Sequence, residues 1–203
     1  DADPAINQPV TGIKPYVTDN RNVLLVDLPG QDVEEGFLTT LLYALQRGIQ
    51  VAYQVEEQEI SVELIGQGEH RKLFLWESAE GGTGVWERLI ETPNSLREVA
   101  REALRICHID PSTGEKSEDH AAETCSTSCY ECLLSYSNQP NHRHIDRHLI
   151  IDFLMDLASS SLQPQQLGLT RGAHYRWLKG LCDPDSPLEN QFLDHLYHQG
   201  FRL

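Results

Sequence analysis

Four cysteines in the middle of the chain constrain its fold more than any other feature. They follow the pattern C-x17-C-x3-C-x2-C, at Cys107, Cys125, Cys129 and Cys132. A helix over 125–136 would place the last three on one face, because an α-helix has 3.6 residues per turn. Cys107 would join them from the apolar stripe of the preceding helix. Four thiolates around one ion form a closed tetrahedral Zn²⁺ site, which is structural rather than catalytic.

Disulfides, buried free thiols and an iron–sulfur cluster are the alternatives to zinc. The sequence shows no secretory signal and its total of five cysteines is odd, and both observations argue against disulfides. A lone cysteine is usually a buried free thiol, which is our interpretation of Cys182. A [4Fe–4S] cluster also takes four cysteines and stays open beside zinc. His108, directly after Cys107, could replace one thiolate, but four cysteines already suffice.

Hydrophobic periodicity predicts an α/β fold, with a small mixed β-sheet of about three strands covered by helices. Continuous or alternating apolar residues predict strands over 22–28, 59–65 and 71–77. Repeats at helical spacing predict helices over 37–55, 85–91, 92–107 and 144–158. Together with the cysteines, the last two helices would form a zinc-stapled helical lobe over 93–158.

Composition divides the chain into four parts. Residues 1–21 hold three prolines without a clear period, and we interpret them as an arm or the tail of a preceding domain. Residues 22–160 form the zinc-binding domain, and 161–185 is interpreted as a linker. Residues 186–203 open with a Ser-Pro-Leu-Glu helix-start signal and would be the first helix of a further, truncated domain. Because the first residue is Asp rather than Met, we expect a fragment of a longer protein.

The acidic balance argues against a nucleic-acid interface over the whole surface. Sixteen Lys and Arg against thirty-one Asp and Glu give a net charge of −15 at pH 7, whereas nucleic-acid-binding domains are usually basic. The segment 141–180 is net positive, so any DNA contact is expected there. Its cations are Arg143, Arg147, Arg171, Arg176 and Lys179. No apolar run approaches the length of a membrane span, so no membrane contact is expected.

The glycine-rich loop Gly81-Gly82-Thr83-Gly84 lies between a predicted strand and a predicted helix. Backbone N–H groups at such a position can bind phosphate, which makes the loop a candidate phosphate contact. It is not a Walker A motif, because no Lys-Ser/Thr pair follows. Nearby glutamates would also repel an anion. We favour a tight turn that allows close packing of helix and strand.

Several short motifs together resemble one known family. They are Glu80-Gly81-Gly82-Thr83-Gly84, Cys107-His108, Tyr130, Cys132-Leu133-Leu134-Ser135-Tyr136, Asn138-Gln139, His142 and the run from His144 to Arg147. In this combination the chain resembles the helicase-associated MZB domain, named for MrfA zinc binding, over about residues 18–160. The four cysteines of that family correspond to Cys107, Cys125, Cys129 and Cys132.

The resemblance implies a non-catalytic, zinc-binding accessory domain at the C-terminus of a DEAD/DEAH-type superfamily 2 DNA helicase. Such helicases act in DNA repair or, in the DISARM system, in phage defence. The domain would brace the motor and guide DNA or a partner subunit in the cytoplasm. Its partners would be the motor domains of the same parent chain or a partner subunit. The chain itself carries no helicase motif, so we do not expect it to be an enzyme alone.

Two other functions stay open. One is a protein-interaction module without nucleic-acid contact, which the acidic charge favours. The other is an iron–sulfur domain with a redox or sensing role.

Overall fold

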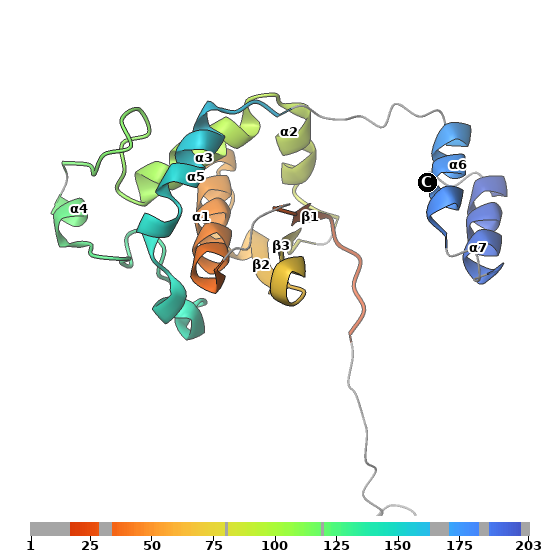
Figure 1. Cartoon of the computed structure of the whole chain (residues 1–203), viewed down its shortest axis with the longest axis horizontal. Helices are drawn as coiled ribbons and strands as arrows, with labels where there is room; N and C mark the ends of the chain where they lie inside the picture. Colours follow the sequence, from red (N-terminus) through yellow and green to blue (C-terminus); the bar gives the residue numbers. More distant parts are fainter. Residues whose placement is uncertain are drawn as a thin grey trace, which may run out of the picture. The chain divides into compact units, whose positions relative to one another are not determined.

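The computed structural model describes residues 17–28, 34–79, 81–118, 120–162, 171–182 and 187–199. The chain forms two compact units, unit 1 (Asp1–Ser161) and unit 2 (Leu162–Leu203). The elements of unit 1 (Figure 1), with η for a short 3-10 helix, are β1 (Val23–Val26), α1 (Glu35–Tyr53), η1 (Glu57–Glu59), β2 (Ile60–Ile65), η2 (Gly68–His70), β3 (Lys72–Glu77), α2 (Val85–Glu91), α3 (Ser95–Ile106), α4 (His120–Thr124), η3 (Gln139–His144), η4 (Arg147–Leu149) and α5 (Ile151–Ser159). Unit 2 contains α6 (Arg171–Leu181) and α7 (Pro187–His198).

The sheet has three strands in the order β1-β3-β2, and each lies within a predicted range. The three predicted strands are therefore confirmed. Both outer strands pair with β3 in antiparallel register, with Leu25 and Glu63 on either side of Phe74. The sheet is thus antiparallel, not mixed as the sequence suggested. A mixed sheet would need β1 beside β2, since these two run in the same direction, but the central place is taken by β3.

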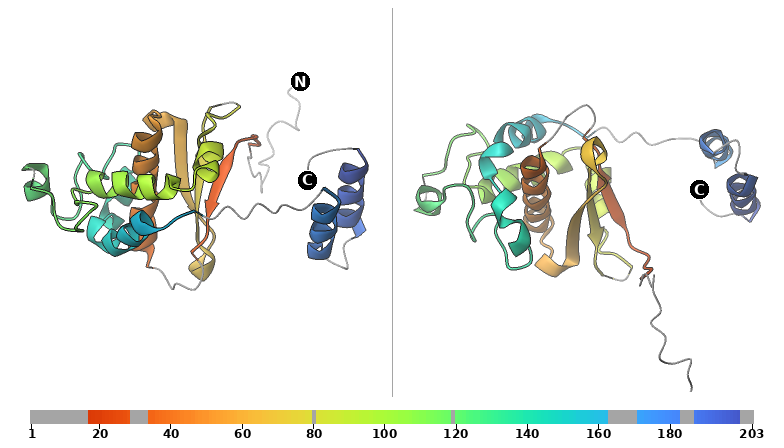
Figure 2. Two further views of the ribbon diagram at one scale, coloured as in Figure 1. Left: turned by 90° about the horizontal axis from the view of Figure 1, so that it is seen from above. Right: turned by 60° about the horizontal axis from the view of Figure 1, so that its bottom comes forward.

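The inner face of the sheet packs on α1, and this contact forms the core of unit 1. Leu73 and Leu75 of β3 are fully buried, as is Leu41 of α1. α3 packs against α1, and α5 packs against α3 (Figure 2). A Cβ atom at Gly48 would lie 2.6 Å from the carbonyl oxygen of Val99 in α3. The glycine inside α1 is therefore explained by the close approach of the two helices.

The outer face of the sheet keeps apolar side chains accessible. Val23 and Leu25 of β1 are 48% and 49% exposed. The rings of Phe74 and Trp76 lie beside each other on β3, with centroids 5.4 Å apart. The pairing of β1 with β3 places these four residues on one face of the sheet, because Trp76 is opposite Val23 and Phe74 is opposite Leu25. None of the helices in the described part of the chain combines the length and hydrophobicity that a membrane span requires.

Two regions differ from the sequence prediction. In place of one helix over 144–158, the chain forms η3, η4 and then α5. The helix cannot run through this segment because the backbone N–H of Arg147 bonds the carbonyl of Thr127 (3.0 Å) instead of a helical partner. In unit 2, α6 lies within the segment predicted as a linker, and Tyr175 stacks on Tyr197 of α7 with ring centroids 4.2 Å apart.

A buried carboxylate closes the end of β3 and the start of α2. Glu77 is fully buried, and its carboxylate accepts hydrogen bonds from Asn22 Nδ2 (3.0 Å), Thr83 Oγ1 (2.9 Å) and the backbone N–H of Val85 (2.7 Å). Burial by itself raises the pKa of Glu77, but these hydrogen bonds outweigh it and hold the pKa below its ordinary value. The charged carboxylate therefore stabilises the fold.

We predict that Glu77→Gln lowers the free energy of unfolding by about 1–3 kcal/mol at pH 7, because a charged acceptor is lost from a buried site. A folded-state pKa below the unfolded value of about 4.3 stabilises the protein above that pH, and this stabilisation is lost as the pH falls through the folded pKa. Urea unfolding of the two proteins should therefore give a stability difference that shrinks in acid. Glu63→Gln, on the exposed face of β2, is the control and should change little. A difference that is constant with pH would contradict this account.

Candidate metal centre

The first donors come from the C-terminal end of α3. This helix ends in a Schellman motif, in which the N–H of Ile109 bonds the carbonyl of Leu104 (2.9 Å) and the N–H of His108 bonds that of Arg105 (3.0 Å). The residue after the C-cap in this motif is left-handed and usually glycine, but here it is His108, with φ 59°. A side chain costs roughly 1 kcal/mol in this conformation. The conformation places Nε2 of His108 3.4 Å from Sγ of Cys129.

The other donors lie on a loop, not on the predicted helix. α4 ends at Thr124, and the chain then turns through the residues that carry the three remaining cysteines. The backbone N–H of Cys129 donates to Sγ of Cys132 (2.9 Å), and the N–H of Leu134 bonds the carbonyl of Cys129 (3.0 Å). A helix over this segment would use these N–H groups for its own ladder. The expectation of a cysteine-bearing helix over 125–136 is therefore wrong.

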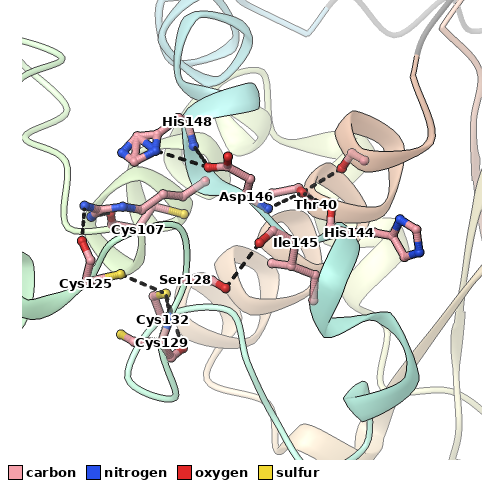
Figure 3. Close-up of polar contacts among 12 residues, drawn as sticks. Thr40, Cys107, Cys125, Ser128, Cys129, Cys132, His144, Ile145, Asp146 and His148 are labelled. Atoms are coloured by element: carbon pink, nitrogen blue, oxygen red, sulfur yellow. Dashed lines mark hydrogen bonds and ion pairs between the residues drawn. The ribbon is translucent and has the colours of Figure 1, made fainter.

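Four side chains converge at this loop. The ligand atoms of His108, Cys125, Cys129 and Cys132 all lie within 4.8 Å of one another. His108, Cys125 and Cys132 are buried, and Cys129 is partly buried. Figure 3 shows the sulfur atoms of the three cysteines close together on the loop. All five cysteines of the described residues are free, and Cys182 lies outside this group, in unit 2.

The separations fit a tetrahedral zinc ion. With Zn–S near 2.3 Å and Zn–N near 2.0 Å, two sulfurs lie about 3.8 Å apart and a sulfur–nitrogen pair about 3.5 Å. Sγ of Cys125 lies 3.9 Å from Sγ of Cys132, and the His108–Cys129 pair is at 3.4 Å. The residues present therefore fit one zinc ion, and His108, Cys125, Cys129 and Cys132 would hold it.

Cys107 is the sequence-predicted ligand that this group of four does not include. Its thiol is buried next to the group. Burial raises the pKa of the Cys107 thiol, and the neighbouring thiol of Cys132 adds to this, whereas the positive charge of Arg147 acts in the opposite direction. The site thus offers five donors for four positions, with Cys107 and His108 adjacent in sequence.

Arg147, which the sequence placed among the DNA contacts, is instead part of this site. Its side chain is only 2% exposed. Nη1 donates to the carbonyl of Cys107 (2.7 Å) and Nη2 to the carbonyl of Cys125 (2.9 Å). A guanidinium held this way has no surface to offer a phosphate. The sequence prediction missed this role because the segment around Arg147 reads as a polar, solvated face.

The chain after the last cysteine is also fixed by polar contacts. Asn138 is buried, and its Nδ2 donates to the carbonyl of Leu133 (2.8 Å). Its Oδ1 accepts from the backbone N–H of Ser135 (2.9 Å) and lies 2.9 Å from Nε2 of His142. The ring of His142 in turn meets Tyr130 edge-on at 5.7 Å. Asn138, His142 and Tyr130 contributed to the family resemblance, but no role was predicted for them from the sequence. In the structure they hold the cysteine loop in its conformation.

The other sequence candidates do not gather into a site in the described residues. Lys179 pairs with Asp194 (2.7 Å), while Arg143 and Arg176 are exposed but belong to different units. The side chain of Arg171 lies outside the described part of the chain.

In the glycine-rich loop, a carboxylate of the protein itself lies where the sequence suggested a bound phosphate. The carboxylate of Glu77 accepts hydrogen bonds from the hydroxyl of Thr83 and from the N–H of Val85, which are the groups that would face a phosphate. A Cβ atom at Gly82 would lie 2.3 Å from Glu77 Oε2, so the glycine makes room for this carboxylate. The structure therefore agrees with the interpretation of this loop as a tight turn.

Comparison with protein families places this site in a known context. Residues 41–133 match the family model MZB, the MrfA Zn-binding domain. Searches of curated proteins and of solved structures gave no match. The matched segment runs from α1 to the end of the cysteine loop and contains every donor of the metal centre. Over residues 41–133 the chain is therefore similar to the MZB family of zinc-binding domains.

Proposed function

We propose that this chain is the non-catalytic, zinc-binding accessory domain of a superfamily 2 DNA helicase that acts in DNA repair or phage defence. One Zn²⁺ ion would join the end of α3 to the cysteine loop. The observation that carries the proposal is the convergence of four donors within 4.8 Å of one another inside a segment that matches the MZB family. In this role the domain braces the helicase motor and guides DNA or a partner subunit.

The donor spacing favours a single ion over an iron–sulfur cluster. In a [4Fe–4S] cluster each ligand binds a different iron atom, so the four donors are spread around the whole cluster. Around one ion they lie within a few ångströms of each other. The spacing of 3.9 Å between Cys125 and Cys132 fits the second arrangement. Burial raises the pKa of the Cys132 thiol, and the N–H of Cys129 that points at its Sγ acts in the opposite direction.

A closed site of this kind acts through stability. The segment 108–124 is polar, and Ile109 and Ala122 are its buried apolar residues within the described positions. Such a segment buries too little apolar surface to offset its conformational entropy. Zinc joins its two ends, so the free energy of metal binding becomes free energy of folding for the lobe.

We predict that the purified chain binds one zinc ion and that Cys132→Ser loses it, because the variant removes one of four ligands and the acceptor of the Cys129 N–H bond. Elemental analysis measures the metal, and circular dichroism follows the loss of ordered structure. Cys182→Ser is the matched control and should keep the ion. Acid should release the ion, since protons compete for the thiolates. Zinc near zero, or iron with sulfide in its place, would refute the assignment.

A second prediction separates the two candidates for the fourth ligand. The distances favour His108, so His108→Ala should weaken zinc binding at least tenfold in competition with a chelator, whereas Cys107→Ala should keep both the stoichiometry and most of the affinity. The opposite pattern would support the set of four cysteines proposed from the sequence. Both substitutions shorten adjacent side chains at the end of one helix, so each serves as the control for the other.

The interaction module without nucleic-acid contact is the second candidate function. Two observations favour it beyond the net charge of −15. Of the five cations considered for DNA, Arg147 is buried in the metal centre and Lys179 is paired with Asp194. The outer face of the sheet, with Val23 and Leu25, leaves apolar surface accessible, which is more typical of protein contacts than of phosphate contacts.

A DNA titration at several salt concentrations distinguishes the two functions. If the domain guides DNA directly, affinity should fall with salt, and Arg143→Glu should reduce both the affinity and the slope of log K against log salt by about one contact. Arg101→Glu on α3, an exposed charge change of the same size and sign outside the net-positive segment, controls for overall charge. Affinity and slope that do not respond to Arg143→Glu would favour the interaction module.

A further inference from the structure

Arg147 is the fully buried cation of unit 1 among the described residues, and its surroundings are unusual for a charge. The guanidinium donates to two backbone carbonyls, and its Nε atom is buried without a hydrogen-bond partner. None of the ion pairs formed by the described residues includes Arg147. Removing a guanidinium from water without a counter-charge costs several kcal/mol. The fold therefore needs a source of negative charge close to this group.

The cysteine donors are that source when a metal is bound. Three thiolates and a neutral imidazole around a divalent ion leave one net negative charge, and four thiolates leave two. The two carbonyls that Arg147 bonds belong to Cys107 and Cys125, on the two segments that supply the donors. The buried cation and the anionic metal centre thus lie side by side, and each reduces the cost of burying the other.

The same side chain links the two segments mechanically. One planar fork reaches the carbonyl of Cys107 at the end of α3 and the carbonyl of Cys125 at the start of the cysteine loop. The backbone N–H of Arg147 adds a third bond, to the carbonyl of Thr127 (3.0 Å). A lysine lacks this planar fork, because its three N–H groups all come from one nitrogen atom.

We propose that Arg147 is the positioning residue of the metal centre: it aligns the two donor segments through their carbonyls and offsets the negative charge of the metal-bound thiolates. This inference rests on the zinc site of the proposed function. In this role Arg147 acts inside the domain and does not contribute to a surface that binds nucleic acid. The residue touches ligand backbones and not the ion, so its effect is on affinity rather than on the number of ions bound.

The test compares zinc affinity in three variants of the full 203-residue chain by competition with a chromophoric chelator. Arg147→Gln keeps a donor group but loses the charge, whereas Arg147→Lys keeps the charge but loses the fork. Arg143→Gln, an exposed arginine on the preceding η3, is the matched control. We expect Arg147→Gln to weaken zinc binding by about 10–100-fold, Arg147→Lys to weaken it less, and Arg143→Gln to leave it unchanged. Circular dichroism with excess zinc checks that each variant is folded.

The outcomes separate this inference from the proposed function. A parent chain that binds no zinc would refute the proposed function itself. A parent chain with one zinc ion and an Arg147→Gln variant of equal affinity would overturn the role of Arg147. Equal weakening in the Gln and Lys variants would overturn the charge-offset part, since only one of them is neutral. If the Gln variant does not fold, the folded Lys variant still tests the alignment of the two donor segments: an unchanged affinity would overturn that part of the inference, and a weakened affinity would support it.

Discussion

A buried guanidinium that bonds the carbonyls of Cys107 and Cys125 is the contact on which the zinc-binding lobe depends. The sheet and helices of unit 1 are joined by a continuous apolar core. The connection between α3 and the cysteine loop crosses a polar segment that contributes little to that core. Besides the few residues that it adds to the core, such as Ile109 and Leu133, this part of the molecule is ordered by directional bonds to the guanidinium, to Asn138 and to the metal. These polar contacts therefore add to the apolar core in fixing the path of the cysteine loop.

The elements with strong periodicity could be predicted from the sequence. The three strands and the helices α1, α2 and α3 follow from apolar residues at spacings of two or of three to four, and burial enforces those patterns. Gly48 lowers the helix propensity of α1, yet the helix runs through it because α3 approaches within contact of its backbone. That reason is tertiary and has no local signal. The antiparallel sheet likewise depends on which strand takes the centre, which local patterns do not encode.

The metal centre could be predicted in part, and the errors concern backbone geometry and burial, which the sequence does not show. Cysteine spacing identified the loop that binds metal, but spacings of four and three suit a helix as well as a turn that wraps an ion. The bond from the Cys129 N–H to the Cys132 sulfur decides for the turn, and a sequence does not show it. His108 was visible as a spare donor, but its left-handed backbone, which carries the imidazole to Cys129, is a property of the helix end. Arg147 was assigned to the surface because its polar neighbours resemble a solvated helix face.

The place of Arg147 changes how the charge of this domain should be understood. A count of cations along the chain treats every arginine as available to phosphate. Arg147 is not available, because its guanidinium is buried and bonds the carbonyl of Cys107. Lys179 is similarly engaged with Asp194, although in exposed surroundings where such a pair contributes little to stability. The buried Arg147 and the buried carboxylate of Glu77 cancel, so the net charge of −15 also describes the surface. Such a surface repels a nucleic-acid backbone at long range, so the charge that remains accessible is more typical of a protein-interaction module than of a domain that contacts DNA directly.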